Sequence, residues 1–558
     1  MSLIDIHDIP SGQIDPEQPG HPRDSFLKGA LILTGATLIV RLLGIAQKLP
    51  LFWLLREEGV GIYNFPYAFY AILLAISSTG INIAISKLVA ERLAAGDRPG
   101  AIRVFRVSRL AMTTLGVFTA TALALVGRFL ANNVHHDPRA ALSYWVLAPA
   151  VFADTLQAAY RGFFQGLQNM RPNALSQVVE QIIRVIIMLS AAYILLGRTG
   201  DLGIAAAGAT FGSTAGAIGS FLLLSLIYQT AVPRYFGQAL REARLIKEPV
   251  WPLVRRIFSY SIPISLAGMG LPMLMLADSA LVSARLQAAG MSMGGATSNY
   301  GVLAGNAMPL VNLPTMLTGA LFVTLVPAIT ESLFRGRRDE ILSRSRTALR
   351  VTLLFSIPAA VGMYLLAGGI VHLLRLQSQA PAAPTEVVVR ALTLGLIFVT
   401  LQQTTSGILQ GLGRNIVPVV NMFLGAALKA VLTYVLVFRI GVTGAAYATA
   451  IGFALTTSLN LYRVYESVGP VIQVRDMIMK PALAAAVMGA AVVPSYLAFT
   501  QLLHSAGLAT LAAIAVGGVV YGLVMLVVGG LRESDLALIP RFGRPLARTL
   551  SRLHLLRA

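Results

Sequence analysis

The sequence predicts an all-α integral membrane protein with fourteen transmembrane helices: two six-helix lobes in a parallel pseudo-repeat, plus two C-terminal helices. The 558-residue chain has a mean hydropathy of +0.72 and only 12% charged residues, a composition typical of a protein that lies in lipid. Apolar stretches of about spanning length recur along it, and its basic residues fall in alternate loops. A β-barrel would instead show short segments that alternate apolar and polar.

The apolar stretches place the fourteen spans in order along most of the chain. They are expected near 27–54, 62–90, 102–127, 139–162, 173–197, 202–229, 257–284, 298–331, 342–373, 386–410, 416–438, 442–466, 477–502 and 506–530. Loops on the predicted cytoplasmic side collect arginine and lysine, as in 92–109 and 234–256, whereas exterior loops are short and nearly balanced, as in 56–58. This bias indicates an even number of spans with both termini in the cytoplasm of a bacterial inner membrane. It also explains the net charge of +20 without a nucleic-acid partner.

The spans and the loops between them define six regions. Residues 1–25 lack the basic start and apolar core of a signal peptide, which indicates a disordered cytoplasmic tail. The regions that follow are 26–230 (N-lobe, helices 1–6), 231–256 (cytoplasmic basic linker), 257–468 (C-lobe, helices 7–12), 469–530 (helices 13 and 14) and 531–558 (basic cytoplasmic tail). Two basic segments, 235–247 and 546–556, are amphipathic. They either lie on the cytoplasmic leaflet, attracted by anionic phospholipid, or are solvated connectors.

A repeat of about 245 residues supports the two-lobe arrangement. Gln165-Gly166-Leu167 recurs as Gln410-Gly411-Leu412, and each copy is followed by a proline and then by a span with a basic residue at the matching place, Arg184 or Lys429. The offset corresponds to six helices. Because six is even, both copies have the same orientation in the membrane.

Several functional chemistries are excluded by composition. The chain has no cysteine, so it forms no disulfide or thiolate metal site, and it has no glycine-rich phosphate-binding loop. We expect no catalytic residue, no metal site and no bound cofactor, with coupling to protons or sodium ions left open. An ATP-driven pump would need a separate motor subunit.

Charged residues inside predicted spans mark the candidate site, because each costs a few kcal/mol in hydrocarbon unless it faces a cavity or a partner. Arg41 and Lys48 on the first span have the register to share an interior face, although Arg41 could instead snorkel or contact a carbonyl. Glu180 and Arg184 are four residues apart and are expected to pair; the pair either lies on the substrate path or only holds helices in register. Asp154, Gln157 and Arg161 form a polar stripe on the fourth span.

The second half contains further candidates. Asp278 stands alone within an apolar stretch, which favours a role in ion coupling, or else a hydrogen-bonded acceptor. The eighth span holds Asn306 and Asn312 beside prolines that should break the helix and free backbone carbonyls, as in the discontinuous helices of transporters. Aromatic residues such as Tyr67, Phe69 and Tyr70 are interpreted as packing or lipid-facing groups.

The chain resembles the stage V sporulation protein B and polysaccharide-export branch of the multidrug, oligosaccharidyl-lipid and polysaccharide exporter superfamily, to which lipid II flippases belong. The resemblance rests on these strings: 41–44 (RLLG), 61–64 (GIYN), 84–91 (AISKLVAE), 161–184 (RGFFQGLQNMRPNALSQVVEQIIR), 260–263 (YSIP) with Asp278, 300–331 and 407–414. It implies two six-helix lobes around a central cavity and alternating access. We expect a monomeric transporter and not an enzyme. The implied cargo is an undecaprenyl-diphosphate-linked glycan, either a lipid-linked oligosaccharide or lipid II, moved to the outer leaflet.

One departure from the resemblance concerns lipid II itself. Gram-negative-type flippases of the superfamily carry a second arginine followed by an aspartate on the first span, where this chain has Gln47 and Lys48, so only Arg41 matches. A diphosphate needs cationic partners in a cavity, which Arg41, Lys48, Lys87 and Arg184 could supply.

Three other functions were weighed against the flippase. A cation-coupled multidrug exporter of the same fold would bind organic cations with carboxylates and aromatic residues. A membrane-embedded glycosyltransferase would need acidic catalytic residues on a sizeable exterior loop, and the exterior loops here are short and acid-poor. A structural scaffold would not explain so many charges within spans.

Overall fold

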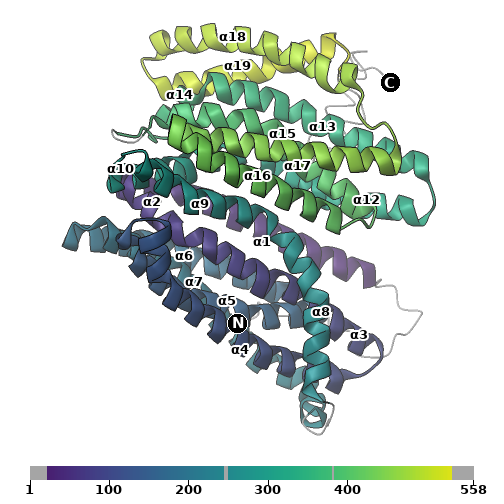
Figure 1. Cartoon of the computed structure of the whole chain (residues 1–558). Helices are drawn as coiled ribbons and strands as arrows, with labels where there is room; N and C mark the ends of the chain where they lie inside the picture. The colour runs from purple at the N-terminus through teal and green to yellow at the C-terminus, as the bar shows by residue number, and fades with distance from the viewer. Residues whose placement is uncertain (1–21, 244–248, 380–382, 531–558) are drawn as a thin grey trace. The chain divides into compact units, whose positions relative to one another are not determined.

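The computed structural model describes residues 22–243, 249–379 and 383–530, and every secondary-structure element in these ranges is a helix (Figure 1). The predicted all-α membrane fold is therefore confirmed. The predicted tails at 1–25 and 531–558 lie wholly or almost wholly outside the described residues, as does the amphipathic segment 546–556. The chain divides into two compact units, the first ending at Ser279 and the second beginning at Ala280.

The first unit is built from long helices joined by short turns. In order they are α1 (Pro22–Ala46), α2 (Lys48–Leu74), η1 (Ala75–Thr79), α3 (Gly80–Ala94), α4 (Arg98–Phe129), η2 (Leu130–Val134), η3 (Pro138–Ala140), α5 (Ala141–Gly166), α6 (Arg171–Thr199), α7 (Leu202–Glu242), α8 (Val250–Gly268) and α9 (Gly270–Ala288), which continues past the division. Asp97 and Asp201 cap α4 and α7 by accepting backbone N–H bonds of 2.7 Å from Gly100 and Gly203. These caps fix the starts of two predicted spans to within a few residues.

The second unit contains the remaining helices, again in tight succession. They are α10 (Met293–Gly301), η4 (Val302–Ala307), α11 (Met308–Asn312), α12 (Thr315–Phe334), α13 (Arg338–Leu365), α14 (Ala367–Leu373), α15 (Thr385–Gly411), α16 (Ile416–Ile440), α17 (Thr443–Val468), η5 (Arg475–Met479), α18 (Lys480–Leu503) and α19 (Ala506–Val527). The predicted break of the eighth span is confirmed: α10, the π-helical η4, α11 and α12 replace one continuous helix. Pro309 and Pro314 lie at the starts of α11 and α12.

One predicted span was wrong in detail. The seventh span, expected to be continuous over 257–284, is broken between α8 and α9 with a bend of 62°. Pro272 cannot donate a backbone hydrogen bond to Gly268, and the glycines on either side of Met269 favour helix weakly, so the helix ends there. The predicted interruption at 56–58 is present as a break in helical geometry at Arg56 (φ 55°, ψ −169°), although helical geometry resumes directly after it within α2.

The described ranges hold nine helical stretches long and apolar enough to cross a membrane, or ten if the bent α8–α9 pair is one span. One stretch, 35–94, has 60 residues, well over the roughly 20 that one crossing needs. Helix α5 is not among the nine; it carries Asp154, Gln157 and Arg161, which lower its hydropathy. The count of fourteen spans therefore stays a prediction.

Matching helix contacts recur in the two units, as the sequence repeat predicts. A methyl group on Gly166, the last residue of α5, would lie 2.7 Å from Cβ of Val89, and one on Gly411, the last residue of α15, would lie 2.8 Å from Cβ of Ile329. The contacts of α6 with α7 and of α16 with α17 also match. Gly216 packs against the Glu180 carbonyl and Cβ of Arg184, and Gly452 packs against the Gly425 carbonyl and Cβ of Lys429.

Candidate functional site

A continuous chain of polar side chains crosses the first unit and joins α2, α5, α6 and α7. Its members on α5 are Asp154, Gln157 and Arg161, which follow at intervals of three and four residues and therefore lie on one helix face. The helix is otherwise rich in buried alanine and aromatic residues that pack against its neighbours. This packing holds the polar face of α5 toward α2, α6 and α7.

The acidic end of the chain is Asp154. Tyr70 on α2 donates its hydroxyl to Oδ2 of Asp154, and Nε2 of Gln157 donates to Oδ1 of Asp154 over 3.2 Å. Nε2 of Gln157 also donates to the Ala217 carbonyl over 2.9 Å. Both carboxylate oxygens therefore have donors, which allows Asp154 to be buried among helices.

Ser220 on α7 joins this end to the basic end. Its hydroxyl donates to Oε1 of Gln157 over 2.8 Å and accepts from Nη2 of Arg161 over 3.2 Å. Ser220 and Gln157 are both fully buried. The link is sealed from solvent, so the two ends of the chain are coupled by hydrogen bonds within the protein.

The basic end is a carboxylate held between two arginines. Nη2 of Arg161 lies 2.8 Å from Oε2 of Glu180, and Nη2 of Arg184 lies 2.6 Å from Oε1 of the same carboxylate. The predicted pairing of Glu180 with Arg184 is confirmed, and Arg161 is an additional partner that one helix could not show. The side chains of Arg161, Glu180 and Arg184 are 19%, 14% and 20% exposed, so the cluster is accessible at its edge.

The two arginines keep hydrogen-bonding capacity beyond these bonds. A guanidinium has five N–H donors, and Nε of Arg161 and Nε of Arg184 are buried and make no hydrogen bond within the described part of the chain. Buried donors without acceptors are unusual in folded proteins. The cluster can therefore accept a further anion, and phosphate oxygens suit the planar fork of arginine.

Aromatic side chains on α2 flank the acidic end. The rings of Tyr63 and Tyr67 are 4.7 Å apart, those of Tyr67 and Tyr70 are 5.8 Å apart, and the Tyr67 hydroxyl bonds to Ser213. The interpretation of these aromatic residues as packing groups is confirmed, because Tyr70 belongs to a buried hydrophobic cluster and Tyr67 and Phe69 pack against it. The hydroxyls of Tyr67 and Tyr70 also have polar partners on other helices. Ser213 and Ser220 lie seven residues apart on one face of α7, and they bond to Tyr67 and to Gln157.

Other predicted residues lie apart from this chain. Arg41 on α1 and Lys48 at the start of α2 are both exposed, while their neighbour Gln47 accepts a bond of 3.0 Å from Gln181 on α6. Lys87 on α3 lies 4.1 Å from the centre of the Tyr260 ring and 3.9 Å from Glu91. Lys87 therefore belongs to a contact between α3 and α8, and a role for it in the site remains a prediction.

The ion-coupling candidate and the broken-helix candidates belong to other helices. Asp278 is buried on α9, next to Ser279, whose hydroxyl donates to the Phe65 carbonyl over 3.1 Å. In the second unit Asn306 is buried in η4 and its Nδ2 lies 3.4 Å from Oγ1 of Thr385, whereas Asn312 is exposed at the end of α11. The described residues include no group of three or more acidic or histidine side chains that could hold a metal ion.

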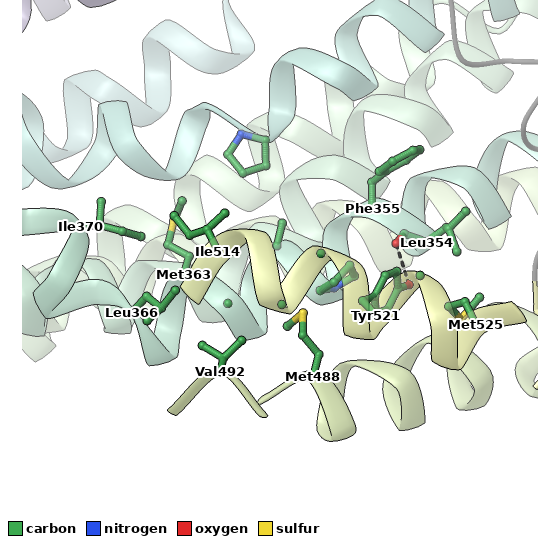
Figure 2. Close-up of a pocket in the computed structure, with 17 residues that line it drawn as sticks. Leu354, Phe355, Met363, Leu366, Ile370, Met488, Val492, Ile514, Tyr521 and Met525 are labelled. Atoms are coloured by element: carbon green, nitrogen blue, oxygen red, sulfur yellow. Dashed lines mark hydrogen bonds between the residues drawn. The ribbon is translucent and has the colours of Figure 1, made fainter. Parts of the chain in front are cut away.

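An apolar cavity of about 510 Å³ lies in the second unit among α13, α14, α18 and α19 (Figure 2). Leu354, Met488 and Met525 are among the side chains that line it, and the hydroxyl of Tyr521, another lining residue, donates to the Leu354 carbonyl over 2.8 Å. None of its described lining residues is charged. The cavity suits a hydrocarbon chain and offers nothing to a charged headgroup.

A series of charged and polar side chains lies within a bundle of long apolar helices. This combination defines a polytopic membrane protein of transporter architecture. The model of the polysaccharide biosynthesis protein family matches residues 26–333, more than half of the sequence, so the chain belongs to that family. The MatE family model matches residues 263–435.

Two curated relatives span nearly the whole chain. Stage V sporulation protein B of Bacillus subtilis (strain 168) is 27% identical over 539 residues, 94% of this chain and 100% of that protein. The lipid II flippase MurJ of the same organism is 26% identical over 519 residues, 89% of this chain and 94% of that protein. These matches confirm the resemblance predicted from the sequence.

Solved structures show the same fold. The lipid II flippase MurJ in an inward closed conformation matches with a TM-score of 0.63 at 17% identity, covering 89% of this chain and 98% of that one. An inward-facing multidrug resistance MATE family transporter matches with a TM-score of 0.62 at 16% identity, covering 79% and 98%. Both structures therefore share the fold of this chain.

Proposed function

We propose that the protein is a flippase that moves an undecaprenyl-diphosphate-linked glycan from the inner to the outer leaflet by alternating access, with lipid II as the first candidate cargo. The observation that carries the proposal is the arginine pair on α5 and α6, Arg161 and Arg184, whose Nη2 atoms converge on one carboxylate with donors to spare. The relatives named as lipid II flippases and the shared fold support it.

The physical argument concerns the headgroup. A diphosphate must be stripped of water to cross the membrane, and its desolvation is offset only by charge-assisted hydrogen bonds inside the protein. Two arginines from adjacent helices provide such bonds on both sides of an anion. Arg41 and Lys48 on the first helices are proposed to meet the headgroup on its path, and Lys87, Asn306 and Asn312 remain further candidates for the cavity wall.

The remaining features of the proposal follow from the sequence. We propose that the protein works as a monomer with both termini in the cytoplasm of a bacterial inner membrane. Its basic cytoplasmic loops would contact anionic phospholipid, and no cofactor is needed. Proton or sodium coupling through Asp278 would drive the cycle.

One observation favours a second candidate, a cation-coupled multidrug exporter. Tyr63, Tyr67 and Tyr70 form an aromatic series beside the carboxylate of Asp154, and such groups bind organic cations. Both oxygens of Asp154 already accept hydrogen bonds, however, and Arg161 and Arg184 lie on the same polar chain. The site therefore favours an anion.

The test is a leaflet-accessibility assay in cells depleted of their own flippase. Lipid II and other carrier-linked sugars are labelled from the outer face, with and without this protein. We expect labelling of at least one carrier-linked glycan to be restored by the protein. Failure to restore any of them, together with resistance to organic cations, would favour the multidrug exporter.

A further inference from the structure

We propose that Glu180 is an internal counter-ion that occupies the headgroup position between Arg161 and Arg184 in the empty protein and is displaced from it by the diphosphate. This inference rests on the proposed function but makes a separate claim. The claim is that Glu180 competes with the substrate for the two arginines.

The first step of the argument is the shape of the bridge. The two carboxylate oxygens of Glu180 bond to different arginines, at 2.8 Å and 2.6 Å, so one small anion joins α5 to α6. Two oxygens of a diphosphate can make the same pair of contacts, because phosphate and carboxylate oxygens both accept from a guanidinium in its plane.

The second step is the shortage of acceptors. Each arginine has a buried Nε without a hydrogen bond in the described structure. Arg161 also donates a hydrogen bond to the neutral hydroxyl of Ser220. A diphosphate carries more acceptor oxygens than one carboxylate. It can therefore satisfy donors that Glu180 leaves unused.

The third step is the state without substrate. Two arginines inside an apolar bundle would be costly with no anion between them, and removing one partner of a buried ion pair is strongly destabilising. Glu180 stabilises the empty site and so allows the protein without substrate to complete the alternating-access cycle. The same bond must be given up when substrate binds, so it lowers substrate affinity and favours release.

The matched control is a second carboxylate between two arginines. Glu340 on α13 lies 2.7 Å from Nη1 of Arg337 and 3.6 Å from Nη2 of Arg344, with 37% of its side chain exposed. It belongs to the second unit and to none of the proposed contacts. Substituting it changes the same chemical group without touching the site.

The experiment measures binding of farnesyl diphosphate and of farnesol to the full-length protein in neutral-lipid nanodiscs. Wild type, Glu180→Gln and Glu340→Gln are compared, together with the double variant Arg161→Gln/Arg184→Gln. We expect Glu180→Gln to bind the diphosphate about tenfold or more tightly than wild type, since a charge-assisted competitor is lost. Farnesol binding should be unchanged in every variant, and Glu340→Gln should match wild type.

The outcomes separate the two claims. Unchanged or weaker diphosphate binding by a folded Glu180→Gln protein overturns the inference and makes Glu180 a positioning residue for the arginines. A wild type that prefers farnesol, or a double arginine variant that binds diphosphate normally, overturns the proposed headgroup site itself. If Glu180→Gln does not fold, Glu180→Asp replaces it: the shorter carboxylate reaches one arginine only, tighter diphosphate binding supports the inference, and unchanged or weaker binding overturns it.

Discussion

Ser220 donates a hydrogen bond of 2.8 Å to Gln157 and accepts one from Arg161, and these bonds join the acidic and basic ends of the polar chain in the first unit. On one side lie Asp154 and Tyr70, and on the other lie Arg161, Glu180 and Arg184. A change at either end can therefore be transmitted to the other through groups that are sealed from water.

The first prediction concerns this link. Gln157→Leu leaves Ser220 and the Ala217 carbonyl without their buried partner, so unfolding free energy should fall by about 1–3 kcal/mol. Thermal unfolding of the purified protein in detergent measures the change. Gln238→Ala, which removes the exposed bond of Gln238 to Glu242, is the control and should change stability by less than about 0.5 kcal/mol. Equal stability of both variants would mean that the link does not contribute to the free energy of unfolding.

The second prediction concerns Arg41. Arg41→Ala should abolish complementation of a flippase-depleted cell while leaving protein levels intact, because it removes a cation from the proposed headgroup path. Growth and membrane abundance are measured together. Arg198→Ala, at the exposed end of α6, is the control and should complement normally. Normal growth of the Arg41 variant removes that residue from the site.

The third prediction concerns Asp278. Asp278→Asn removes the charge of a buried side chain without changing its size, so transport should lose its dependence on protons or sodium if this carboxylate couples them. Initial rates of transport are compared across a range of pH and of sodium concentration. A variant whose responses to both match those of wild type excludes the coupling role.

The fourth prediction concerns His135, which lies in the turn after η2. Its Nδ1 donates to the Ser279 carbonyl over 2.9 Å, its Nε2 is 2.6 Å from the Tyr144 hydroxyl, and its ring stacks on Phe65. Burial lowers the pKa of His135 to about 4, against the smaller opposing effects of the Ser279 carbonyl and nearby Asp137. The folded protein therefore holds this imidazole neutral.

The sign of the pH dependence follows from this lowered pKa. Above pH 6.5, the ordinary value, both folded and unfolded forms are neutral at His135 and stability is complete. As pH falls from 6.5 toward 4 the unfolded form gains a proton that the folded form excludes, so about 3 kcal/mol of stability is lost. Thermal unfolding from pH 7.5 to 4.5 should show this loss in wild type and less of it in His135→Gln. The exposed His504→Asn variant should retain the wild-type slope.

The sequence alone predicted most helix positions, because long apolar runs and basic loops record where the chain enters and leaves the membrane. It also predicted the Glu180–Arg184 ion pair, since residues four apart share a helix face. The partners Ser220 and Tyr70 were not predictable in this way, because they come from helices far away in the chain. The bend before Gly270 was missed because it depends on a few local residues inside an apolar stretch.

The central claim is that Arg161 and Arg184 together carry the diphosphate of a lipid-linked glycan. The most direct test is flipping of fluorescent lipid II in proteoliposomes, measured by a membrane-impermeant quencher, for wild type, Arg161→Gln/Arg184→Gln and the exposed control Arg198→Gln. We expect wild type and Arg198→Gln to expose the lipid to the quencher at equal rates, and the double variant to fall to the rate of empty liposomes. A correctly folded double variant that flips lipid II as fast as wild type would contradict the account.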